Sequence, residues 1–269
     1  MAQDYFYFDK GKLIELAEKR KTDYQEAEPF PHIVLDNFLP PAVLDQVVTE
    51  FPTPEQGKWK EFTEATQNLK MACEDETNIG PGTRHLLNQF NSSTFLSFLE
   101  TLTGVSSLLA DPHFRGGGLH QTKRGGSLGV HADFNYYKKL KLYRRINVIV
   151  YLNKNWPEGF GGHLELWDKD MKKCVQKVLP IFNRVVIFNT DNLSNHGQPD
   201  PLTCPEDNTR KSLALYYYTV DSPSGEVEEA HSTIFRARPG QDQDFKKTPS
   251  RLKSRAKKVL SKIKSWLQK

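Results

Sequence analysis

The chain has 269 residues, of which 37% are hydrophobic and 11% aromatic, and its formal net charge is +4. This length predicts one large domain, or one domain with small appendages. The three cysteines form no CxxC pair, which argues against a disulfide framework and against a structural zinc site. The first residues are polar and acidic, and no apolar run approaches the ~20 residues of a membrane span. We therefore expect a soluble, cytoplasmic protein without a signal peptide.

Charge is distributed unevenly along the chain. Ten of the 37 basic residues lie in 246–269, a segment with no acidic residue, so the rest carries 27 basic and 33 acidic residues. An acidic body with a basic tail calls for separate explanations of the two parts.

The first 104 residues predict a support region of helices and loops. Apolar positions such as Leu44, Val47 and Phe51 recur at helical spacing, and Pro is well tolerated where this helix starts. By the same reasoning we expect helices within 11–28, over 41–50 and around 95–102, a strand at 32–35, and loops over 55–82.

Residues 105–222 have a different pattern. Short runs with strand character are separated by turn residues, without the intervening helices that a parallel sheet needs. The runs are 146–152, 163–167, 175–179, 184–188 and 212–219. This spacing predicts an all-β sandwich or barrel as the core, followed by a C-terminal extension over 223–245 and a basic helix over 246–269.

The sequence His131-Ala132-Asp133 is the first feature with chemical content. In a strand, residues i and i+2 point to the same side, so one imidazole and one carboxylate can face a common metal ion. His196 is the candidate third ligand. Two histidines and a carboxylate form the facial triad of non-haem Fe(II) oxygenases, which leaves positions open for other ligands. The alternative is that both histidines are ordinary core or surface residues.

Arg210 and Ser212 form a second candidate pair. Arg210 lies fourteen positions after His196, and the two residues share one face of the predicted strand at i and i+2. A guanidinium beside a hydroxyl suits a carboxylate ligand. An exposed arginine at a strand start is the alternative, but the ordered set HxD, H and RxS is less expected by chance than any of its parts.

Further motifs surround these residues. Tyr151-Leu152-Asn153 is followed by Trp156 in a turn and by Gly161-Gly162 before the next strand. With these motifs, residues 120–219 resemble the 2-oxoglutarate oxygenase superfamily, specifically its prolyl-4-hydroxylase-like branch. The chain departs from the collagen-type enzymes, which usually carry Lys where Arg210 stands. It also departs in the segment 199–208, an insertion-like loop that we expect near the mouth of the active site.

The resemblance implies a mainly β protein with flanking helices, built on a double-stranded β-helix or jelly-roll core. It implies an iron and 2-oxoglutarate dependent dioxygenase, with ascorbate (vitamin C) as a possible reductant. It also implies roles for individual residues: Fe(II) bound by His131, Asp133 and His196, the far carboxylate of 2-oxoglutarate bound by Arg210 with Tyr151 and Ser212 beside it, and Leu164 and Gln121 lining the pocket.

The expected reaction is hydroxylation of an unactivated C–H bond with O2 and 2-oxoglutarate, releasing succinate and CO2. The resemblance favours a prolyl residue of a protein or peptide as substrate. Two alternatives stay open: a small molecule or glycan hydroxylated by the same chemistry, and a binding protein of the same fold without catalysis.

Two basic segments have less certain roles. The charged run 138–145 predicts a solvated loop, or a surface that steers an acidic substrate. In the tail, apolar residues recur on one helix face among lysines and arginines. Such a helix can pack against the body, lie on an anionic membrane as a peripheral anchor, or contact nucleic acid or an acidic partner.

Overall fold

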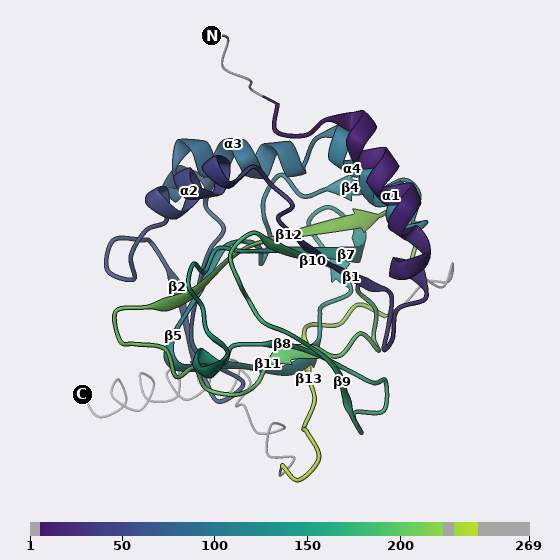
Figure 1. Ribbon diagram of the computed structural model, residues 1–269. Helices are drawn as coiled ribbons and strands as arrows, with labels where there is room; N and C mark the ends of the chain where they lie inside the picture. The colour runs from purple at the N-terminus through teal and green to yellow at the C-terminus, as the bar shows by residue number, and fades with distance from the viewer. Residues whose placement is uncertain (1–5, 223–228, 242–269) are drawn as a thin grey trace, which may run out of the picture.

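The structure is a computed structural model, and it describes residues 6–222 and 229–241. In this part of the chain, thirteen strands form one antiparallel sheet that curls into a nearly closed barrel, with four α-helices along one side (Figure 1). This architecture confirms the predicted double-stranded β-helix core with flanking helices. The predicted basic helix over 246–269 lies outside the described residues.

The four helices come from the first part of the chain and begin at residues that suit helix starts. Asp9 caps the first helix by accepting a hydrogen bond from the Lys12 amide at 3.1 Å. Pro41 and Pro81 occupy the first positions of the second and third, where no intrahelical N–H is lost. The helices are α1 (Lys10–Gln25), α2 (Pro41–Glu50), α3 (Pro81–Phe90) and α4 (Ser93–Thr103).

The strands are arranged in the order β1-β10-β7-β12-β5-β11-β8-β9, and the long strand β5 pairs with partners on both sides of the barrel. The strands are β1 (His32–Asp36), β2 (Lys60–Glu64), β3 (Gln67–Cys73), β4 (Leu109–Ala110), β5 (Gly118–Ala132), β6 (Tyr136–Tyr137), β7 (Leu142–Tyr151), β8 (Leu164–Trp167), β9 (Cys174–Val178), β10 (Arg184–Asn189), β11 (His196–Gln198), β12 (Thr209–Thr219) and β13 (Ile234–Phe235).

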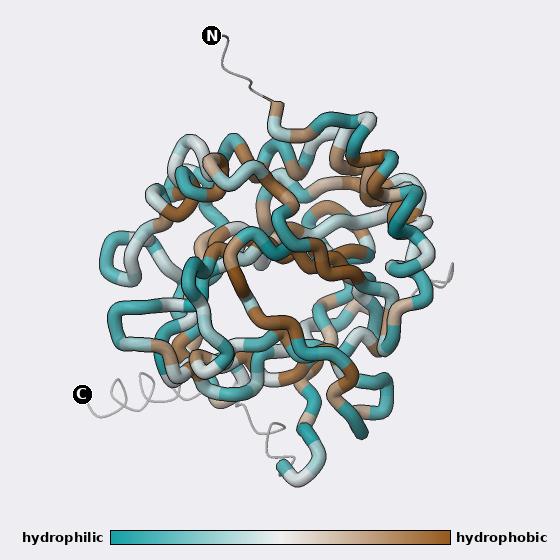
Figure 2. Tube along the Cα trace, viewed as in Figure 1, coloured by the Kyte–Doolittle hydropathy of each residue, from teal (hydrophilic) through white to brown (hydrophobic). Residues whose placement is uncertain are grey.

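Alternation along the strands divides the apolar residues between two cores. In β10, Val185 and Ile187 belong to the large core beneath the helices, whereas Val186 and Phe188 belong to a smaller core with Leu164. The apolar residues, brown in Figure 2, accordingly gather along the strands that the helices cover. The helices thus pack on the outer face of one side of the barrel, and the candidate site lies on its inner face.

Two predictions for the polar segments were wrong. Residues 55–82 are not mainly loop: they contain the β2–β3 hairpin and the start of α3. The hairpin escaped prediction because β2 is largely exposed and its register is set by the pairing of β3 with β5, rather than by burial of one face. Residues 138–145 are not simply a solvated loop, because β7 begins at Leu142 and the Arg144 side chain is only 2% exposed.

No helix among the described residues combines the length and the apolar character needed to cross a bilayer.

Candidate active site

Three predicted ligands meet inside the barrel. His131 lies near the end of β5, Asp133 follows that strand directly, and His196 begins β11. Antiparallel pairing of the two strands places His196 opposite His131. One potential ligand atom from each residue lies within 4.8 Å of the other two, and both histidines are 95% buried. The structure therefore brings the triad together as the spacing indicated.

The hydrogen bonds of both imidazoles orient them toward a common point. The Nδ1 of His131 lies 2.8 Å from the Gly129 carbonyl, and the Nδ1 of His196 lies 2.9 Å from the Ser194 carbonyl. A carbonyl only accepts, so each Nδ1 carries the proton and each Nε2 offers a lone pair. The Nε2 atoms of His131 and His196 lie 3.5 and 3.4 Å from the Asp133 carboxylate.

Electrostatics keep His196 and Asp133 in the protonation states that a metal needs. Burial lowers the pKa of His196 to about 4, so its imidazole is neutral near pH 7. Burial alone would raise the pKa of Asp133, but Arg144 and the two imidazoles hold that pKa well below its ordinary value. The site thus presents an anionic carboxylate beside a neutral imidazole.

Arg144 and Asn147, both on β7, hold the Asp133 carboxylate in place. Arg144 Nη2 lies 2.9 Å from Asp133 Oδ2, and Asn147 Nδ2 donates to the same oxygen at 2.8 Å. Arg144 also donates to Asn147 Oδ1 from two nitrogens, and its guanidinium stacks on the ring of Tyr216 at 3.4 Å. No sequence motif indicates this support, and Arg144 is recognisable only as part of the charged run after the HxD motif.

A small cavity of about 90 Å³ joins the triad to the predicted carboxylate-binding residues. Arg210, Ser212 and Leu164 line it together with the three triad residues. Arg210 is fixed by donating from Nε to the Gly162 carbonyl at 2.7 Å and from Nη2 to the Tyr151 hydroxyl at 3.1 Å. Tyr151 is fully buried, and its ring lies 4.9 Å from the Arg210 guanidinium carbon.

The prediction that Gln121 lines the pocket was wrong. Its neighbours on β5, His120 and Thr122, line the cavity instead, because successive side chains of a strand point to opposite faces. Gln121 is buried on the other face, where its carbonyl accepts a hydrogen bond from the Thr209 hydroxyl at 2.9 Å. The register of β5 determines which of these neighbours faces the cavity, and this register could not be predicted from the sequence alone.

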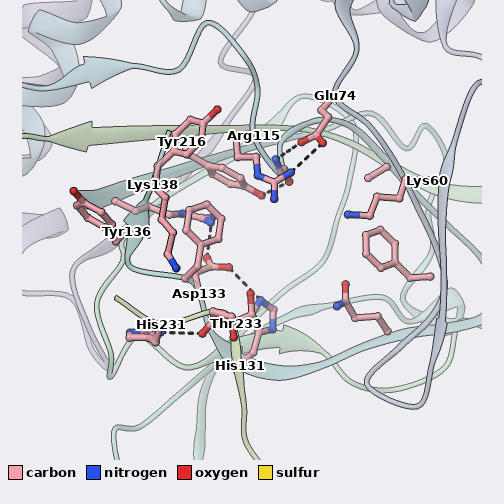
Figure 3. Close-up of a pocket in the computed structure, with 18 of the residues that line it drawn as sticks. Lys60, Glu74, Arg115, His131, Asp133, Tyr136, Lys138, Tyr216, His231 and Thr233 are labelled. Atoms are coloured by element: carbon pink, nitrogen blue, oxygen red, sulfur yellow. Dashed lines mark hydrogen bonds and ion pairs between the residues drawn. The ribbon is translucent and has the colours of Figure 1, made fainter. Parts of the chain in front are cut away.

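A wider cleft of about 750 Å³ opens beside the triad (Figure 3). Its walls come from the β2–β3 hairpin, from the residues around β6, and from residues 230–235, while His131 and Asp133 lie at its inner end. Lys70 on β3 lines both this cleft and the small cavity. A ligand in the cleft would therefore have direct access to the triad.

The expectation that the loop 199–208 lies at the mouth of the active site was wrong. None of these residues lines the small cavity or the wide cleft. Leu202 and Cys204 are buried against Trp156, and Arg124 donates to the Cys204 carbonyl at 2.6 Å. Leu202 instead packs close to Gly162, whose carbonyl accepts a hydrogen bond from Arg210.

The comparisons with known proteins agree with this site. Residues 117–218 match the family model described as the 2OG-Fe(II) oxygenase superfamily, whose members use iron and 2-oxoglutarate. Two imidazoles and one carboxylate, all turned to one point, are the donor set that suits non-haem Fe(II), so these residues fit the metal. No curated protein matches the chain in sequence.

Solved structures share the fold at low identity. A prolyl hydroxylase from Trichoplax adhaerens, in complex with a hypoxia inducible factor peptide fragment, is 20% identical with a TM-score of 0.57, covering 77% of this chain and 91% of that one. A prolyl-4-hydroxylase from Pseudomonas putida is 14% identical with a TM-score of 0.55, covering 77% and 98%. The non-heme alpha ketoglutarate dependent epimerase SnoN from nogalamycin biosynthesis is 11% identical with a TM-score of 0.53, covering 84% and 97%.

At these identities the solved structures show that the fold is shared, whereas the match to the family model is a match in sequence. Residues 117–218 of this chain thus match the 2OG-Fe(II) oxygenase superfamily model, and the fold around them is shared with prolyl hydroxylases.

Proposed function

We propose that the chain is a hydroxylase in which His131, Asp133 and His196 hold Fe(II) and Arg210 holds the distal carboxylate of 2-oxoglutarate. The observation that carries this proposal is that one small cavity is lined by the complete triad and by Arg210. Bound iron and 2-oxoglutarate supply the oxidising chemistry, in which O2 is consumed, succinate and CO2 are released, and one oxygen atom enters a substrate C–H bond.

The residues of the chain have three tasks in this scheme. His131 and His196 present Nε2 lone pairs from rings fixed by backbone carbonyls. Arg210 offers a guanidinium that is held by hydrogen bonds to the Gly162 carbonyl and the Tyr151 hydroxyl. Ser212 adds a hydroxyl on the same face. Such prior orientation reduces the entropy lost when the cosubstrate binds.

The favoured substrate is a prolyl residue in a protein or peptide. Two observations support it: the fold is shared with prolyl hydroxylases, and a cleft of about 750 Å³ beside the triad is lined by the β2–β3 hairpin and by residues 230–235. A cleft of this volume can hold several residues of a polypeptide.

A small molecule is the second candidate substrate. The fold is also shared with an epimerase of nogalamycin biosynthesis, and a volume of about 750 Å³ lies within the range of small-molecule pockets. The third possibility, a binding protein without catalysis, is disfavoured by a triad that is complete and correctly oriented.

Succinate formation tests the proposal. The purified chain with Fe(II), ascorbate and 2-oxoglutarate is expected to form succinate faster when the right acceptor is present. The candidate substrates are distinguished by three sets of acceptors: proline-containing peptides, the same peptides with alanine in place of proline, and small molecules. A mass gain of one oxygen atom on the proline peptides alone supports the prolyl reading. Stimulation by small molecules alone overturns that reading, and no succinate under any condition overturns the enzyme itself.

A further inference from the structure

The wide cleft carries a strong excess of positive charge. Six of the residues that line it are basic and two are acidic: Lys60, Lys70, Arg115, Lys138, Lys139 and Arg144 against Glu74 and Asp133. Both carboxylates are already engaged by arginines. Arg144 lies 2.9 Å from Asp133, and Arg115 lies 3.4 Å from Glu74.

The pairing leaves a set of lysines without an anionic partner. Lys139 lies 3.2 Å from His113, which is not an acid. For Lys60, Lys70 and Lys138, no ion pair is formed with any residue in 6–222 or 229–241. The ammonium groups of Lys60 and Lys70 lie over the face of the Phe62 ring, at 5.0 and 5.4 Å from its centroid.

Lys70 is the member of this set closest to the reaction centre. It pairs with Thr122 on β5, which pairs with Arg210 on β12, so the three residues form a row across adjacent strands. Burial, together with the nearby cations Arg210, Arg144 and Lys60, lowers the pKa of Lys70 to about 8 against the opposing effect of Asp133. The charged form of Lys70 is therefore poorly stabilised, and a bound anion would offset the free-energy cost of burying its charge.

The lysines stand on two sides of the triad. Figure 3 shows Lys60 on one wall of the cleft and Lys138, beside Tyr136, on the other, with His131 and Asp133 between them. A ligand that binds the lysines of both walls needs anionic groups on either side of the atom that faces the triad. A single small anion could bind the lysines of only one wall.

We propose that this cleft recognises an acidic peptide, with carboxylate side chains flanking the target residue on both sides. Lys70 and Lys60 bind the flanking carboxylate on the hairpin side, and Lys138 binds the one on the opposite side. The proposal rests on the proposed hydroxylase function and specifies its substrate class. Arg210 lies in the inner cavity, so the cosubstrate carboxylate and the substrate carboxylates occupy separate positions.

The test measures binding rather than turnover. Fluorescein-labelled peptides of one length, with a central proline flanked by Glu, Gln or Lys, are titrated with the full chain loaded anaerobically with Fe(II) and 2-oxoglutarate. Fluorescence anisotropy gives each dissociation constant. We expect the Glu peptide to bind at least about tenfold more tightly than the Gln peptide and the Lys peptide to bind weakest. We also expect the difference to shrink as salt is raised.

Variants assign the effect to the cleft. Lys70→Met is expected to weaken binding of the Glu peptide about tenfold, and Lys60→Gln and Lys138→Gln about threefold each, without changing the Gln peptide. Lys70→Arg keeps the charge and should retain binding. Lys19→Gln, an exposed lysine of α1, is the matched control. An unchanged thermal unfolding midpoint in Lys70→Met shows that the barrel is intact.

Three results would overturn the proposal. One is equal affinity for the Glu and Gln peptides. Another is a Lys70→Met variant that loses 2-oxoglutarate binding while it keeps the Glu peptide, because Lys70 would then serve the cosubstrate. The last is inorganic phosphate or free glutamate that binds as tightly as the Glu peptide, which indicates a small anionic acceptor. Tight, lysine-dependent binding of the Glu peptide without oxygen incorporation supports anion recognition and separately rejects the prolyl target.

Discussion

The inner cavity and the wide cleft lie side by side but differ in how their charges are compensated. In the cavity, Asp133 is paired with Arg144, and Arg210 is anchored by a carbonyl and a phenol. In the cleft, Lys60 and Lys70 lie over an aromatic ring and form no ion pair with any residue in 6–222 or 229–241. Under the proposed function, the residues that bind 2-oxoglutarate are already held in place by hydrogen bonds and ion pairs. The lysines of the cleft, in contrast, remain available to bind an anionic substrate. Mutations in the two regions should therefore affect different measured quantities.

The largest effect is expected for the triad. His131→Ala or Asp133→Ala removes one of three ligands, so succinate formation from 2-oxoglutarate should fall below detection, together with Fe(II) binding. His163→Ala, which removes a histidine of the neighbouring turn outside the triad, is the control and should keep most of the activity. Wild-type decarboxylation by either triad variant, purified with iron, would show that the ligand assignment is wrong.

The next largest effect concerns Arg210. Arg210→Ala leaves the distal carboxylate of 2-oxoglutarate without its guanidinium, so the half-saturating concentration should rise about 100-fold. Arg20→Ala, at a half-buried arginine of α1 that pairs with Asp23, is the matched control. An unchanged 2-oxoglutarate titration would remove Arg210 from its role, and a loss confined to peptide binding would move it to the cleft.

A smaller effect is expected for Arg144, which supports a ligand without being one. Arg144→Met removes the partner of Asp133 and the stack on Tyr216, so Fe(II) affinity should fall about 10- to 100-fold while 2-oxoglutarate still requires iron to bind. Isothermal titration under anaerobic conditions measures both. If the affinity for iron is unchanged while folding stability drops, Arg144 has only a structural role.

The smallest expected effect is a pH dependence of acceptor binding. Lys70 faces Asp133, Arg210, Arg144, Lys60 and His120, and burial lowers its pKa to about 8. Its positive charge is thus present below that pH and lost above it. The affinity for the Glu peptide should therefore decrease about threefold as the pH rises through 8 and beyond, with no such decrease for Lys70→Arg. A parallel decrease in both proteins would assign the pH effect to another group.

The sequence predicted best those parts of the molecule that depend on local patterns. The bounds 41–50 of α2, the strand 184–188 and the meeting of His131, Asp133 and His196 follow from proline placement, apolar runs and strand alternation. The helix and the strand depend on residues that are close in sequence. The triad depends on only three residues, two of which are neighbours in one motif.

The parts that could not be predicted depend on pairing between distant strands. The β2–β3 hairpin owes its register to β5, and that register also turns His120 and Thr122 rather than Gln121 toward the cavity. Arg144 looked like part of a solvated run because its partner Asp133 is brought to it only by the turn before β7.

The central claim is that the triad and Arg210 form one site for iron and 2-oxoglutarate. Anaerobic calorimetric titration of 2-oxoglutarate into the chain, with and without Fe(II), tests it most directly. We predict one cosubstrate per chain, bound only when iron is present, with affinity lost in Asp133→Ala and strongly reduced in Arg210→Ala. Binding that is equally tight without iron, or unchanged in Asp133→Ala, would contradict the claim.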